Sequence, residues 1–211
     1  MSEKTIALDN FTFNFNFKHL LFVVLLLAGL YFLSQYLTIK QAISNAPTYN
    51  YEEVAALAEE IYTSGEVSDA VNNLPLEASV LAKLISELER ILQKTTDYPG
   101  CELYYLRARF NGKYPILMYG NQITGYANLK VSEVWKIGQT CNGEELRYPR
   151  DIYYTNKVED ISMTNEELLF EVIQQGSYKE ILILEKLMIY TYPFWSGHPE
   201  LAKPPGCKIY R

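Results

Sequence analysis

The 211-residue sequence predicts an α+β protein in which a small three-stranded antiparallel sheet flanked by helices follows a single transmembrane helix and a helical linker region. Three observations predict this fold class. An uncharged apolar stretch lies near the N-terminus, apolar residues then recur at helical spacing, and strand-like segments rich in Tyr, Leu and Val follow a turn signal. With 48% hydrophobic residues, the chain can bury one core of ordinary domain size.

The first predicted element is a membrane anchor at residues 20–39, which follows an N-terminal tail of residues 1–19. No charged residue interrupts the stretch, and about 20 helical residues at 1.5 Å each span roughly 30 Å, the thickness of a bilayer core. A cleaved signal peptide is the alternative, but the apolar block begins late and no convincing A-x-A site follows it. Lys4 and Lys18 precede the anchor and only Lys40 follows it closely. The positive-inside rule thus favours an outward C-terminal domain by one lysine and leaves its side of the membrane undetermined.

Residues 40–97 predict an acidic helical linker region. The first 97 residues hold 12 acidic and 6 basic side chains, so the acidic excess of the chain lies there. A helix over residues 51–64, ended by Gly65, accounts for the spacing of its apolar residues. A second helix over residues 74–92 would either pack onto the following domain or form a homodimer through its apolar seam. That seam comprises Leu74, Ala78, Leu81, Ile85, Leu88 and Leu92.

The turn signal at residues 97–100 marks the expected start of a C-terminal domain, residues 98–211. We expect three strands there and, after a capping-box pattern at Ser177 and Glu180, a helix ending before Pro193. The expected strands are residues 102–110, residues 114–119 after an Asn-Gly hairpin turn, and residues 131–137 stopped at Gly138, with a loop over residues 120–128 and a helix over residues 181–192.

The three cysteines, Cys101, Cys141 and Cys207, are odd in number and widely spaced, so free thiols are expected and the compartment is left open. The 98–211 segment holds 13 basic and 13 acidic residues. A neutral segment lacks the broad basic field of a tight non-specific nucleic-acid binder, and any DNA contact would have to be local.

Candidate catalytic residues are spread over the C-terminal domain. Phosphodiester hydrolysis needs an activated water, a cation on the developing charge and usually a divalent metal held by a carboxylate. Glu185 stands out because it interrupts an apolar helical run, where a carboxylate is costly unless a cation meets it. The alternative is that Glu185 lies at the edge of the apolar face of the helix and pairs with Lys186 or another base. The full candidate set is Tyr104, Tyr105, Lys136, Arg147 and Glu185.

Over about residues 101–211 the order of motifs resembles the GIY-YIG endonuclease superfamily, in particular a bacterial branch. The L-Y-Y of residues 103–105 stands for the first motif, the W-K-I-G of residues 135–138 for the second, and P-P-G-C-K-I-Y-R at residues 204–211 for the tail. The resemblance implies a GIY-YIG-like nuclease domain, anchored in a bacterial inner membrane, that cleaves DNA.

In that resemblance, Tyr104, Tyr105 and Lys136 would prepare the water. Arg147 would stabilise the phosphorane, and Glu185 would hold Mg²⁺ or Mn²⁺. Departures from the family pattern support an alternative, a catalytically degenerate membrane-tethered interaction or nucleic-acid-binding module. Lys136 replaces the second tyrosine, the late asparagine has no counterpart, and residues 106–134 lengthen the segment between the two motifs.

Overall fold

The computed structural model describes residues 24–31, 33, 49–119, 122–143 and 168–208. The chain divides into two compact units, Met1–Asn45 and Ala46–Arg211. In the first unit, residues 24–31 and 33 are helical, and the remainder of the predicted 20–39 anchor lies outside the described residues. Within the described part, no helix has both the length and the apolar character needed to cross a bilayer.

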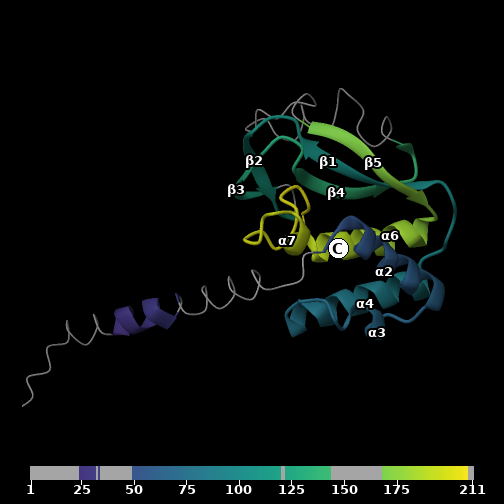
Figure 1. The fold of residues 1–211 in the computed structure, drawn as a ribbon, viewed down its shortest axis with the longest axis horizontal. Coiled ribbons are helices and arrows are strands. Elements are labelled where there is room, and N and C mark those ends of the chain that lie inside the picture. Colours follow the sequence, from purple (N-terminus) through teal and green to yellow (C-terminus); the bar gives the residue numbers. More distant parts are fainter. Residues whose placement is uncertain (1–23, 32, 34–48, 120–121, 144–167, 209–211) are drawn as a thin grey trace, which may run out of the picture. The chain divides into compact units, whose positions relative to one another are not determined.

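The second unit is an α+β structure in which helices come first, the strands of two small sheets follow, and helices come last (Figure 1). In chain order the elements are α2 (Tyr51–Ser64), α3 (Ser68–Val71), α4 (Ala78–Lys94), β1 (Cys101–Ala108), β2 (Gly112–Leu117), β3 (Ile123–Leu129), β4 (Val134–Thr140), β5 (Leu168–Gly176), α6 (Tyr178–Tyr190) and α7 (Tyr192–Trp195).

The main sheet has three antiparallel strands in the order β4-β1-β5, which confirms the α+β part of the prediction, a three-stranded antiparallel sheet flanked by helices. Its central strand β1 pairs with β4 so that Tyr104 lies opposite Gly138 and Tyr105 opposite Ile137. Strands β2 and β3 form a separate hairpin between β1 and β4. That hairpin occupies most of the 106–134 segment that separates the two motifs.

Two strand predictions were wrong. The predicted second strand does not return onto the first, because both edges of β1 are occupied by β4 and β5; instead β2 pairs with β3, which covers most of the predicted 120–128 loop. Gly138 does not end its strand, since β4 continues to Thr140. Gly138 is instead needed because the Tyr104 ring packs directly against it.

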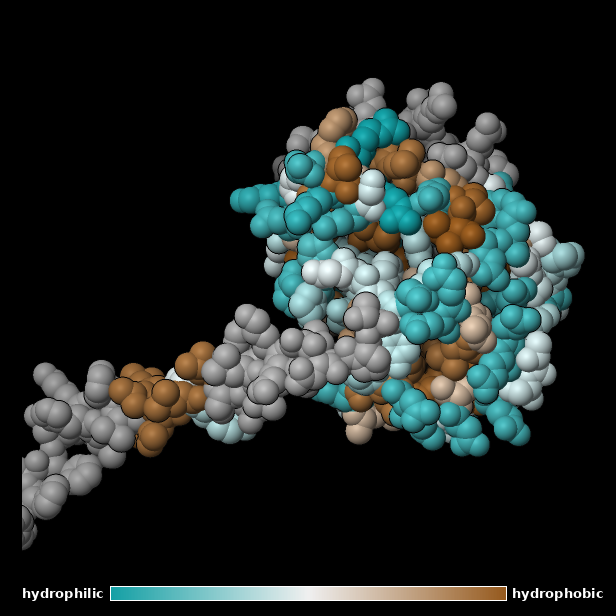
Figure 2. All heavy atoms as spheres, viewed as in Figure 1, coloured by the Kyte–Doolittle hydropathy of each residue, from teal (hydrophilic) through white to brown (hydrophobic). Residues whose placement is uncertain are grey.

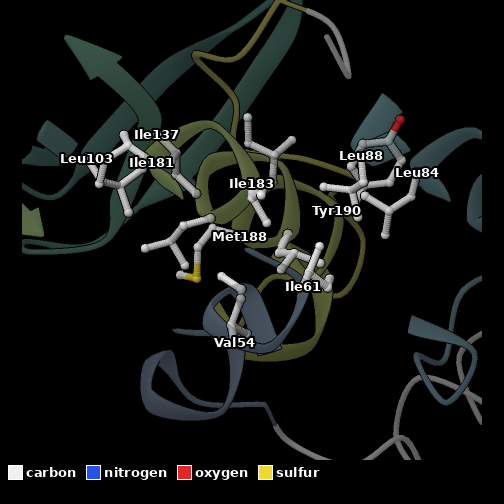
Figure 3. Packing of buried hydrophobic residues seen from close by; sticks show 14 of the residues in the cluster. Val54, Ile61, Leu84, Leu88, Leu103, Ile137, Ile181, Ile183, Met188 and Tyr190 are labelled. Atoms are coloured by element: carbon white, nitrogen blue, oxygen red, sulfur yellow. The ribbon is translucent and has the colours of Figure 1, made fainter. Parts of the chain in front are cut away.

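The helices stack on one face of the main sheet, with α6 in the middle (Figure 1). Helix α6 contacts β1 and β4 on one side and α2 and α4 on the other. Figure 3 shows the resulting core, in which Leu103 and Ile137 from the sheet and Val54 and Ile61 from α2 surround α6 side chains. Residues 49–97 therefore pack against the C-terminal segment, and the turn at residues 97–100 falls inside one compact unit.

The helix ends follow the sequence signals. Helix α2 has the predicted bounds, and Gly65 closes it in the left-handed conformation, with φ of 74°. Helix α6 begins with the predicted capping box, in which the Ser177 side chain accepts the Glu180 N–H and the Glu180 carboxylate accepts the Ser177 N–H. These caps satisfy backbone N–H groups that have no partner within the helix.

Helix α4 packs onto the body of the domain through a line shifted from the predicted seam. Its buried residues are Leu84, Leu88 and Ile91, whereas Ala78 is exposed. Contact with α6 covers this line, which is the first of the two uses that the sequence allowed for the helix.

Candidate functional site

The two candidate tyrosines of β1 lie on opposite faces of the sheet, as neighbouring residues in a strand must. Tyr104 is 0% exposed; its ring stacks on Phe170 with centroids 4.6 Å apart. A Cβ atom at Gly138 would lie 2.5 Å from Tyr104 Cζ. This close approach explains the glycine of the second motif, because any larger residue would displace the Tyr104 ring.

Tyr105 faces the helices and is 4% exposed. Its ring stacks near Trp195 of α7, with centroids 6.1 Å apart, and the Arg107 guanidinium carbon lies 4.9 Å from the ring centroid. Burial raises the pKa of Tyr105 far above its ordinary value, and the positive charge of Arg107 offsets only part of this. Tyr105 therefore stays a neutral phenol at physiological pH.

The remaining candidates are divided between the two faces of the sheet. Lys136 pairs with Leu106 in the β1–β4 register, so it shares the face of Tyr104. Glu185 is half-buried on α6, the helix that covers the face of Tyr105. The structure thus places Tyr104 with Lys136 and Tyr105 on the side of Glu185. Arg147 lies outside the described residues.

The Pro-Pro-Gly tail runs beside β4 and joins it to the hairpin. The Gly206 N–H donates to the Trp135 carbonyl at 2.7 Å, and the Leu117 N–H donates to the Pro205 carbonyl at 2.7 Å. A Cβ atom at Gly206 would lie 2.7 Å from the Trp135 indole, so glycine is needed for this approach. Trp135 is therefore a core anchor for the tail.

The tail also brings charges from three segments together around Cys207. The Cys207 thiol lies 3.4 Å from the Ile137 carbonyl. Burial raises the pKa of Cys207 to about 11, and the charges of Lys136, Glu185 and Lys203 also act on it, the two lysines lowering the pKa and the glutamate raising it. Two candidates 49 residues apart in sequence, Lys136 and Glu185, thus both act electrostatically on one thiol at the edge of β4.

This group of charges does not fit a divalent cation. Two of its charged members are lysines and one is a carboxylate, whereas Mg²⁺ requires oxygen ligands and favours carboxylates without competing cations. Across the described ranges, no three side chains of His, Cys, Asp or Glu gather as a metal site would need.

Lys186 is the most buried charged residue of α6, at 2% exposed. From the sequence it was considered only as a partner for Glu185. Lys186 Nζ lies 2.9 Å from Glu87 Oε2, with side chains 3% and 14% exposed. The Tyr190 hydroxyl donates to the other Glu87 oxygen at 3.2 Å. This buried ion pair joins α6 to α4. Glu87 lies in the middle of α4 beside its buried residues. An acidic residue at that position is the feature of the sequence that could have predicted this ion pair.

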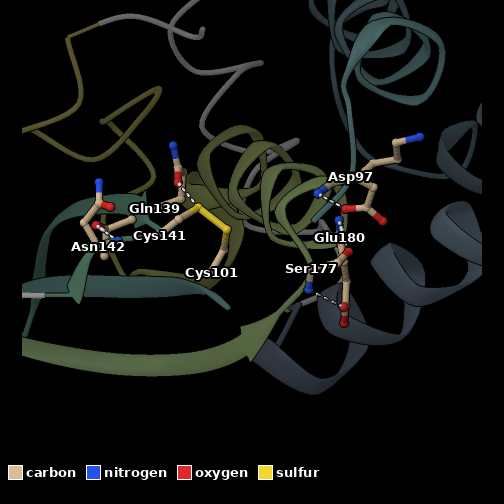
Figure 4. The surroundings of a disulfide bond; sticks show 9 residues. Asp97, Cys101, Gln139, Cys141, Asn142, Ser177 and Glu180 are labelled. Carbon is tan, nitrogen blue, oxygen red and sulfur yellow. Dashed lines mark hydrogen bonds between the residues drawn. A yellow bond between two sulfur atoms is a disulfide. The ribbon is translucent and has the colours of Figure 1, made fainter. Parts of the chain in front are cut away.

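Cys101 and Cys141 form a disulfide, which corrects the expectation of free thiols for these two residues (Figure 4). The β1–β4 register explains the pairing: Glu102 lies opposite Thr140, so the next pair outward is Cys101 and Cys141. Their spacing in sequence gave no hint, because the register depends on the hairpin between them. Cys207 carries a free, buried thiol.

A second polar cluster ties the tail to the β3–β4 turn. His198 Nε2 lies 2.8 Å from Glu133 Oε2, and the Lys130 N–H donates to the same carboxylate. Burial alone would lower the pKa of His198, but hydrogen bonds and charges of Glu133 and Glu200 outweigh burial and raise the pKa. His198 therefore positions the tail, consistent with a loop role.

Comparison with known proteins adds no family assignment: no family model, curated protein or solved structure matches this chain.

Proposed function

We propose that this protein is a membrane-tethered binding module whose C-terminal domain keeps a GIY-YIG-like scaffold without hydrolysing phosphodiesters. The observation that carries the proposal is the burial of both motif tyrosines on opposite faces of the sheet. In this reading the L-Y-Y and W-K-I-G motifs remain because their residues pack: Tyr104 fits against Gly138, and Trp135 fits against Gly206.

Catalysis would require a group that can reach water and change its protonation state near neutral pH. Tyr104 is sealed between Phe170 and Gly138. Tyr105 is buried with a strongly raised pKa, so it cannot act as a base. Neither tyrosine is therefore placed to prepare a water for attack.

The disulfide supports an extracytoplasmic position for the domain. Disulfides persist in oxidising compartments and are rare in the cytosol. The bond between Cys101 and Cys141 thus agrees in direction with the lysine count around the predicted anchor. A domain on that side would seldom meet chromosomal DNA, which also favours binding over DNA cleavage.

A second candidate, metal-dependent phosphodiester hydrolysis, is favoured by one observation. Lys136 and Glu185, two residues that the GIY-YIG resemblance assigns to catalysis, both act electrostatically on Cys207. Together with Arg147, they would form the reactive group in that case, with Mg²⁺ or Mn²⁺ bound by Glu185 and DNA as the substrate.

One assay separates the two functions. The full-length protein, purified in detergent, is incubated with supercoiled plasmid and Mg²⁺ or Mn²⁺, beside Glu185→Gln and, as a control with the same charge change, Glu89→Gln at an exposed position of α4. The binding module predicts equal nicking by all three proteins at the level of buffer alone. Nicking that Glu185→Gln removes and Glu89→Gln retains would establish the hydrolase instead.

A further inference from the structure

The β2–β3 hairpin differs in charge from the rest of the protein. Residues 109–132, which are the hairpin and its two flanking turns, hold three basic residues, Arg109, Lys113 and Lys130, and no acidic residue. The whole chain has 19 basic and 25 acidic residues, so every acidic residue lies outside this segment. The hairpin and its two flanking turns therefore form a local cation-rich surface on an acidic protein.

The same segment exposes large apolar and aromatic side chains, and brown residues lie among teal ones on this part of the domain (Figure 2). Six of them are between 37% and 76% exposed, and Tyr119 at the hairpin tip is the most exposed. They are Phe110, Met118, Tyr119, Ile123, Tyr126 and Val131. With Arg109, Lys113 and Lys130, which are also exposed, we call these residues the hairpin patch.

The hairpin patch is held on a folded base. Tyr114, Ala127 and Leu129 point inward and pack in one cluster with Trp135. The two turns at the base are joined, because the Val131 N–H donates to the Asn111 side chain at 2.8 Å. The hairpin thus has its own buried side, and the six exposed apolar residues are not needed to fold it.

Exposed apolar side chains interspersed with cations match the interface of an anionic bilayer. Apolar and aromatic side chains enter the boundary between headgroups and acyl chains, while Lys and Arg bind anionic headgroups. Single-stranded nucleic acid would use the cations and the aromatic rings, but it offers no comparable partner for Met118, Ile123 and Val131. The mixed composition therefore favours a lipid surface.

The length of the tether points to the same occupant. Residues 40–48 separate the predicted anchor from the first described residue of the domain. Nine residues span at most about 32 Å when fully extended. If residues 20–39 cross the bilayer, this tether keeps the domain close to the membrane surface. Even a weak affinity of the hairpin patch for lipid is then sufficient for contact.

We propose that the hairpin patch docks the domain onto an anionic lipid bilayer, with the hairpin lying along the headgroup level so that Tyr119 at one end and Lys113 and Lys130 at the other both reach it. This contact fixes how the tethered domain is oriented and directs its acidic remainder away from the membrane. The proposal goes beyond the binding function above and is independent of whether the domain hydrolyses phosphodiesters.

The test uses tryptophan depth probes in the full-length protein reconstituted into vesicles of phosphatidylcholine and phosphatidylglycerol, with ordinary or brominated acyl chains. The Tyr119→Trp variant places a probe on the patch. The Tyr98→Trp variant, at an exposed tyrosine before the opposite end of β1, is the matched control. Brominated lipid is expected to quench the added emission of Tyr119→Trp and to leave that of Tyr98→Trp unchanged, over the common background of Trp135 and Trp195.

A charge variant tests the electrostatic part. Changing Arg109, Lys113 and Lys130 together to Gln should weaken docking about fivefold per charge, or about 100-fold in all, and abolish the quenching. The same change at three exposed basic residues of α4 should leave the quenching intact; these are Lys83, Arg90 and Lys94.

Equal quenching at the two probe positions would overturn the proposal, as would quenching that survives the hairpin charge variant. Absence of lipid quenching, together with quenching of the Tyr119→Trp probe by a single-stranded oligonucleotide in detergent, would also overturn it and identify the patch as a nucleic-acid surface. Equal unfolding midpoints for all variants ensure that each result reports on docking. The plasmid assay is separate, so failure of one proposal leaves the other to its own test.

Discussion

Loss of the Cys101–Cys141 disulfide should destabilise the domain by a predictable amount. The bond joins residues 40 positions apart and so closes a loop that contains the whole hairpin and β4. In the chain-entropy description, a loop of this length limits the unfolded chain enough to stabilise the folded state by about 4 kcal/mol. Native geometry adds no competing rearrangement, because the two cysteines already face each other across β1 and β4.

The measurement is urea unfolding of the full-length protein in detergent, with and without a reductant, beside the Cys101→Ala/Cys141→Ala double variant. Reductant should lower the free energy of unfolding of the native protein by about 4 kcal/mol, to the value of the double variant. The double variant should not respond to reductant. It serves as the control for effects of reductant on Cys207, which is buried.

Two results would refute this reasoning. If the oxidised native protein and the double variant unfolded at the same urea concentration, the bond would not constrain the unfolded chain. If thiol counting in denaturant gave three free thiols in protein isolated without reductant, the two cysteines would not be paired. The second result would also remove the support for an oxidising compartment.

Three further predictions follow from buried contacts. Gly138→Ala should lower the free energy of unfolding by about 1–3 kcal/mol in urea titrations, because the new methyl group overlaps a buried ring. Lys186→Met alone should cost about 3–5 kcal/mol by leaving Glu87 buried without its cation, whereas the double change with Glu87→Leu should recover most of the loss. The pKa of His198 is raised by its carboxylate partners, so its stabilisation is complete below its ordinary pKa of 6.5 and disappears as pH rises through the folded pKa. The pKa of Glu133 is lowered, so the charged pair should stabilise the fold most between its ordinary value of 4.5 and 6.5. A double-mutant cycle that combines His198→Gln with Glu133→Gln should show a larger coupling at pH 5.5 than at a pH above the folded pKa of His198. Equal coupling at the two pH values would contradict this prediction.

Helices were the part of the fold that sequence could predict best. The capping box before α6 and the glycine after α2 are local signals, because each satisfies backbone groups within a few residues. The burial line of α4 was displaced, since it is determined by contact with α6 and not by the spacing of apolar residues alone. Local chemistry fixes where a helix ends, and the partner fixes which side is buried.

Strand pairing could not be read in the same way. The Asn-Gly pair at residues 111–112 predicted a tight hairpin, but it connects two strands that belong to different sheets. Strand β3 has three exposed residues among its first four, so its pattern resembled a loop. Strand β5 begins beside an acidic segment, and no strand was predicted there. In each case the missing information was the identity of the pairing partner, which is non-local.

The candidate site shows the same limit at the scale of single residues. One step along a strand reverses the face, so the adjacent Tyr104 and Tyr105 cannot serve one cleft, although a motif counts them together. One step along a helix turns the side chain by about 100°, which is why Lys186 is buried against α4 while Glu185 is only half-buried. A motif specifies residue types in order, and catalysis requires their directions. In this domain the directions favour packing, with Gly138 and Gly206 making room for aromatic rings at both motifs.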